Sequence, residues 1–120
     1  MDLAIAEGIR FFNAQRFFEA HEALEAVWLK AQGDEKSFLH GLIQVAAAFH
    51  HYHRGNAKGF RTVLEKAMQK LEKFEGVRAG IDVTALRDQI ACWSRLIENS
   101  GSIGRTRQPA LPIIMTNENR

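Results

Sequence analysis

The sequence predicts an all-α protein: a single small bundle of about five to six helices around a central helix at about 35–54, with an extended C-terminal tail. Three observations predict it. Apolar residues recur at helical spacing, alternating β-branched runs between tight turns are absent, and both prolines, Pro109 and Pro112, lie near the end of the chain. We expect residues 1–99 to form the helical domain and residues 100–120 to form a tail that is either extended or disordered.

Turn-forming residues divide the domain into five predicted helices, at about 2–12, 16–31, 35–54, 57–74 and 82–99, with a loop at 76–81. Asn56 and Asp82 should cap the helices that follow them, because their side chains can accept hydrogen bonds from free backbone N–H groups. The helix at 57–74 has one apolar side, as a surface helix does, whereas the helix at 35–54 is apolar nearly all round. That difference places the helix at 35–54 in the centre of the bundle.

Composition and charge exclude several classes of protein. The 120 residues carry 16 Lys plus Arg and 14 Asp plus Glu, a net charge of +2, which argues against a strongly basic nucleic-acid binder. The longest stretch without charged residues, 37–53, is shorter than the roughly 20 apolar residues of a membrane span. A lone cysteine, Cys92, favours a cytoplasmic location. We expect no nucleic-acid or membrane partner; a homo-oligomer stays open, and the small-molecule ligand is unknown.

Polar side chains lie on helix faces that should be buried. At 100° per residue, His21 falls in the middle of the apolar stripe of its helix, and Glu25 lies one turn along. On the central helix, His40, Gln44 and His51 form a polar stripe with alanines between them. A buried carboxylate is costly unless it is paired, hydrogen-bonded or metal-bound. We therefore expect His21, Glu25, Gln44 and His51 to meet between these two helices.

Two roles would explain such a cluster, a metal site or a structural network. Side chains at i and i+4 can hold one ion, so His21 and Glu25, with His51 as third ligand and Gln44 in support, suit zinc, manganese or iron. An open coordination position would then allow hydrolysis by a metal-activated water, with Glu22 as a candidate catalytic residue. Trp28 and His40 are expected to support the cluster by packing beside it. The alternative is a non-catalytic interaction or assembly module in which these residues form a structural hydrogen-bonded network.

The same residues carry a resemblance to a known family. Residues 12–28 and 38–48, with Arg54-Gly55-Asn56, resemble the bacterial and archaeal proteins called domain of unknown function 309. The family's hallmark, H-x-x-x-E-x-x-[WY], is met by His21, Glu25 and Trp28. The resemblance covers roughly residues 1–98 and implies an all-α bundle with one central helix. The family has no characterised activity; its motif implies metal binding and, by extension, a hydrolase.

Overall fold

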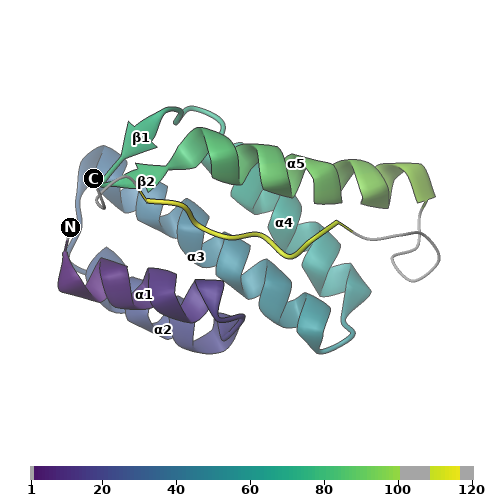
Figure 1. Cartoon of the computed structure of the whole chain (residues 1–120), viewed down its shortest axis with the longest axis horizontal. Helices are drawn as coiled ribbons and strands as arrows, with labels where there is room; N and C mark the ends of the chain where they lie inside the picture. Colours follow the sequence, from purple (N-terminus) through teal and green to yellow (C-terminus); the bar gives the residue numbers. More distant parts are fainter. Residues whose placement is uncertain (1, 101–108, 117–120) are drawn as a thin grey trace.

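The computed structural model describes residues 2–100 and 109–116, which form five helices and one short hairpin (Figure 1). The elements are α1 (Leu3–Asn13), α2 (Phe17–Trp28), α3 (Gly33–His53), α4 (Ala57–Leu71), β1 (Val77–Arg78), β2 (Ile81–Asp82) and α5 (Val83–Ser100). The all-α prediction is confirmed, with five helices. Within the described part of the chain, no helix combines the length and the apolar character that crossing a membrane requires.

Helix α3 is the centre of the bundle, as its apolar surroundings predict. It packs against α2 on one side and α4 on another, while α1 covers α2 and α5 lies along α4 (Figure 1). The ring of Phe49, which is fully buried, shows this arrangement at one residue. Its centroid lies 5.7 Å from Phe17 of α2, 5.1 Å from Phe60 of α4 and 5.4 Å from Trp93 of α5. The contacts with Phe60 and Trp93 are edge-on, and contacts of this kind stabilise the core beyond the burial of the rings themselves.

The predicted helix caps are present. Asn56 accepts a hydrogen bond from the backbone N–H of Gly59 at 2.9 Å, and Asp82 accepts one from Ala85 at 2.9 Å. Each carboxylate or amide oxygen therefore satisfies a backbone donor that the first turn of its helix leaves free.

The prediction of a loop without strands at 76–81 is wrong. Val77 pairs with Asp82 and Arg78 with Ile81 in an antiparallel hairpin. The two turn residues, Ala79 and Gly80, both have positive φ, 54° and 80°, which is the geometry of a tight hairpin turn. Asparagine or glycine normally stands where Ala79 does, so the sequence lacks the usual indication of this turn.

Residues 109–116, which we call the strap, take the extended alternative predicted for the tail. They run across the bundle between α1 and α5 (Figure 1), and Ile114 is buried. The side chain of Asn13 accepts from the Ile114 N–H at 2.8 Å and donates to its carbonyl at 3.0 Å; Gln89 pairs with Ile113 in the same way at 2.9 and 2.8 Å. Because successive residues of an extended chain point their N–H and C=O groups to opposite edges, the two amides hold the strap from both sides. The remaining residues of the predicted tail, 101–108 and 117–120, lie outside the described part of the chain.

Candidate functional site

The first candidate residue, His21, lies at the edge of the buried stripe of α2 and not in its middle. The buried side chains of this helix are Phe17, Ala20 and Leu24, whose mean direction is roughly 70° away from that of His21 at 100° per residue. The His21 side chain is 29% exposed. No polar or charged residue is buried among those that the structure describes, so the residues of the expected buried cluster are each only partly buried.

One atom of His21 is nevertheless buried. Its Nδ1 is inaccessible and has no hydrogen-bond partner among the described residues; the nearest carboxylate oxygen, Glu22 Oε2, is 4.0 Å away. Glu25, one turn along on the same side of α2, is half-buried and forms no ion pair within the described ranges. A buried polar atom without a partner costs free energy, which an external ligand or water can recover.

His51, the predicted third ligand, faces α4 and not α2. Its Nδ1 lies 3.2 Å from the Asn56 side-chain nitrogen, and a Cβ added at Gly59 would come within 2.9 Å of it. The predicted convergence of His51 with His21 is therefore not seen. The physical reason is the rotation of α3 about its axis: the side of α3 that meets α2 lies about 100°, one residue, away from His51.

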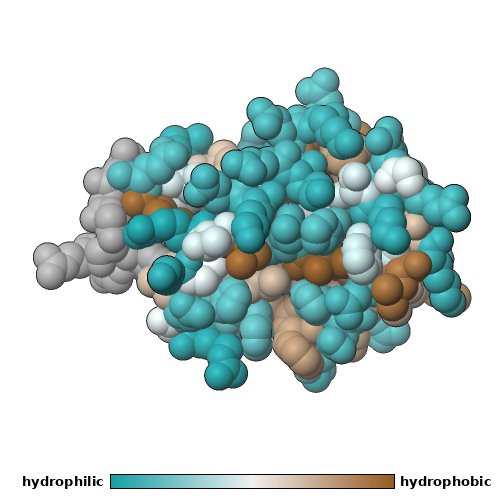
Figure 2. Space-filling model, turned by 180° about the vertical axis from the view of Figure 1, so that it is seen from behind, coloured by the Kyte–Doolittle hydropathy of each residue, from teal (hydrophilic) through white to brown (hydrophobic). Residues whose placement is uncertain are grey.

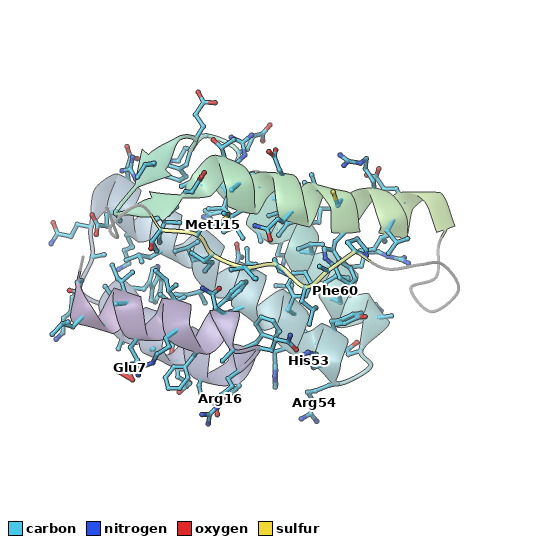
Figure 3. The ribbon with its side chains drawn as sticks, in the orientation of Figure 1. Glu7, Arg16, His53, Arg54, Phe60 and Met115 are labelled. Atoms are coloured by element: carbon cyan, nitrogen blue, oxygen red, sulfur yellow. The ribbon has the colours of Figure 1, made fainter. Side chains whose placement is uncertain are left out.

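Three imidazoles of α3 lie against rings of α2: His53 beside Phe17 at 5.1 Å, His40 beside Trp28, and His50. Of these, His50 is the residue next to His51. The His50 ring lies 5.6 Å from that of Phe18 on α2. Burial lowers the pKa of His50, and the positive charges of Arg54, His51, His21 and His53 lower that pKa further. The neutral form, which can bind a metal ion, is thereby favoured. Figure 3 shows His53 and Arg54 at the end of α3 that lies beside the turn carrying Arg16.

Gln44 and His40 line a groove between α3 and α4. Gln44 Oε1 is buried and, among the described residues, has no hydrogen-bond partner. The ring of His40 lies 5.6 Å from that of Trp28. Trp28, which was predicted to pack beside the cluster, therefore reaches α3 from α2. Burial and then the charge of Lys70 lower the pKa of His40. Figure 2 shows the side of the molecule away from the strap, where hydrophilic side chains cover most of the surface.

The structure brings together fewer of the predicted residues than either the metal site or the structural hydrogen-bonded network requires. In the part of the chain that the structure describes, no group of three or more His, Cys, Asp or Glu side chains could hold a metal ion. A satisfied structural network is not formed either, because His21 Nδ1 and Gln44 Oε1 have no partners there. In the described structure, α2 and α3 each carry one buried atom whose hydrogen-bonding capacity is unused, His21 Nδ1 and Gln44 Oε1.

Two groups of functional interest were not found from the sequence. The first is the pair Lys66 and Lys70, which line the groove between α3 and α4 together with Gln44. The amides that hold the strap, Asn13 and Gln89, carry no sequence pattern that distinguishes them from exposed polar residues at helix positions. Only the docking of residues 109–116 shows what these side chains do.

Comparison with known proteins agrees with the predicted resemblance. Residues 5–63, which span α1 to the first part of α4, match the family described as "Domain of unknown function (DUF309)". The matched segment is shorter than the predicted extent of residues 1–98, and it contains His21, Glu25, Gln44, His50 and His51. A relative from Aquifex aeolicus (strain VF5), named "Uncharacterized protein", is 32% identical over 74 residues, which cover 58% of this chain and 22% of the relative. This chain thus spans about a fifth of that relative's length.

Proposed function

The chain belongs to the DUF309 family, and from this premise we propose that it is a helical binding domain that holds a divalent metal ion between α2 and α3. The protein ligands are His21 and Glu25 from α2, with His50 of α3 in place of the predicted His51. The metal site is proposed for a helical domain that matches a family of unknown function.

A single observation carries the proposal: His21 has a buried Nδ1 without a partner, on the helix side where Glu25 also lacks one in the described part of the chain. Imidazole nitrogen and carboxylate oxygen are the donors that zinc, manganese and iron bind in proteins. His50 supplies a second imidazole whose burial favours the unprotonated form. These residue types fit the ion, although binding requires side-chain movement because the described side chains do not already converge.

A metal held by three protein ligands would keep a position open for water and lower the pKa of that water. Hydrolysis by activated water is accordingly the reaction class that we propose. Glu22, whose Oε2 lies 4.0 Å from His21 Nδ1, is the carboxylate placed to accept a proton beside it.

The test is metal analysis of protein purified without a histidine tag, together with the shift in unfolding temperature on adding zinc or manganese. We expect bound metal and a thermal shift in the natural chain, and loss of both in His21→Ala and in Glu25→Gln. His50→Ala should weaken binding, whereas His51→Ala, the matched control on the same helix turn, should not. Absence of metal and of a thermal shift would overturn the proposal; loss of binding in His51→Ala but not in His50→Ala would overturn the ligand assignment.

A second candidate is an assembly module, and the strap favours it. Ile113 and Met115 are 51% and 53% exposed, on the outer side of a segment whose intervening residue, Ile114, is buried. Apolar side chains held outward in this way can pair with a second copy. Sedimentation velocity tests it: the natural chain should form a dimer that the Ile113→Ser, Met115→Ser variant lacks, and a natural chain that stays monomeric would exclude it.

A further inference from the structure

The groove between α3 and α4 has the size and lining of a small-ligand site. Its volume is about 540 Å³, within the range of ligand pockets, and it is separate from the α2 residues of the proposed metal site. The α3 side supplies Ser37, His40 and Gln44, and the α4 side supplies Lys66, Lys70 and Lys73. Of the groove's charged groups, three are lysines and one is a carboxylate, Glu72, so the groove is electropositive.

Two of these lysines are available to a ligand. Lys73 lies 3.6 Å from Asp34, but Lys66 and Lys70 form no ion pair with any described residue. The stem of Lys70 packs against α3, because a Cβ added at Gly41 would come within 3.3 Å of its Cγ. The stem is thus held at the groove while the charged ammonium group beyond it stays solvated and open to a ligand.

His40 reports the same positive environment from the α3 side. Burial, followed by the charge of Lys70, lowers the pKa of the His40 imidazole. An anion bound beside Lys70 would oppose the effect of the Lys70 charge, because the negative charge would stabilise the protonated ring. The His40 imidazole is therefore a built-in probe of anion binding in the groove.

Gln44 adds a second requirement for the ligand, a hydrogen-bond donor. Gln44 lines the groove, and its Oε1 is buried and accepts no hydrogen bond from the described residues. Lysine ammonium groups bind the negative part of a ligand, whereas a free amide oxygen binds a hydrogen-bond donor. The ligand that satisfies both ends carries an anionic group and, a short distance away, a hydroxyl or amino group.

From this combination we propose that the α3–α4 groove binds an organic phosphate monoester, with the phosphate on Lys66 and Lys70 and a ligand hydroxyl donating to Gln44 Oε1. The proposal does not depend on metal binding. A dianionic phosphate offers two ammonium groups more charge than a single carboxylate does, and the volume accommodates a small sugar-like or polyol phosphate. Lys66 and Lys70 lie beyond the segment, 5–63, that matches the family.

The test is an NMR titration of the His40 ring with glycerol 3-phosphate and, separately, with sulfate at constant ionic strength. We expect a saturable shift of the His40 resonance and a higher His40 pKa with either anion. Replacing both lysines in Lys66→Ala, Lys70→Ala should weaken the affinity at least about tenfold. Lys58→Ala, on the first turn of the same helix and outside the groove lining, should change it less than about twofold.

Gln44→Leu separates the two ends of the proposed ligand. Sulfate has no hydrogen to donate, so its affinity should be unchanged, whereas the affinity for glycerol 3-phosphate should fall several-fold. Equal weakening of both anions, or of neither, would overturn the role of Gln44. A His40 shift that does not saturate, or that Lys58→Ala reduces as much as the double variant does, would overturn the site. Unchanged thermal unfolding of each variant establishes that its fold is intact.

Discussion

Replacing Asn13 with alanine should weaken the docking of the strap on the bundle while leaving the helices in place. Asn13 is the last residue of α1, and its side chain makes two hydrogen bonds with Ile114, at 2.8 and 3.0 Å. A hydrogen bond of this kind contributes about 0.5–1.5 kcal/mol, so their loss should weaken docking of the strap by about 1–3 kcal/mol. Alanine favours helix more than asparagine does, so α1 itself should not suffer.

Hydrogen exchange at the Ile113 and Ile114 amides measures this directly. A docking free energy lowered by about 1–3 kcal/mol corresponds to exchange about 5 to 150 times faster, if the strap opens as one unit. Ile113 should accelerate together with Ile114 even though its own partner, Gln89, is untouched. Gln69→Ala, which removes an exposed amide from α4, is the control and should leave both rates unchanged. If the Ile114 amide stays as protected in Asn13→Ala as in the natural chain, the side-chain pairing does not hold the strap and the reasoning fails.

Three further outcomes follow from packing and charge. Ile114→Ala, at a side chain 2% exposed, should lower the free energy of unfolding by about 2–5 kcal/mol in urea titrations. Gly41→Ala would place a Cβ 2.6 Å from Leu71 Cδ2, so we expect a loss of about 1–3 kcal/mol and a lower Tm; an unchanged Tm would show that Leu71 moves freely. Burial and then Lys70 lower the pKa of His40, so the unfolded chain binds that proton more tightly. The stability contributed by neutral His40 is therefore complete above about pH 6.5 and is lost as the pH falls below it. In His40→Asn, the free energy of unfolding should depend less steeply on pH in this range.

The helices and their caps could be predicted because their causes are local. Asn56 and Asp82 cap α4 and α5 with oxygen atoms only a few residues from the N–H groups that they satisfy. The hairpin at 77–82 was not predicted because its two-residue turn needs a positive φ at Ala79, a conformation that alanine rarely takes.

The candidate site was predicted in part. The sequence identified His21, Glu25 and Gln44 as polar groups needing an explanation, and two of the three have a buried atom without a partner in the described structure. It also predicted His51 as a ligand, where the structure places His50 toward α2. Neighbouring residues on a helix point about 100° apart. Because α3 is apolar on nearly every side, the sequence pattern does not indicate which of its faces, that of His50 or that of His51, meets α2.

The sequence alone determined that the chain is helical, that α3 is its centre and which family it resembles, because periodicity, capping residues and a short motif are properties of neighbouring residues. Only the tertiary structure decided which face of α3 meets α2, how Lys66 and Lys70 come to lie opposite Gln44, and that residues 109–116 dock on Asn13 and Gln89. Each of these depends on the rotation of one helix against another or on a contact between residues as many as 101 positions apart. Such contacts are set by the packing of the whole core, which no local pattern records.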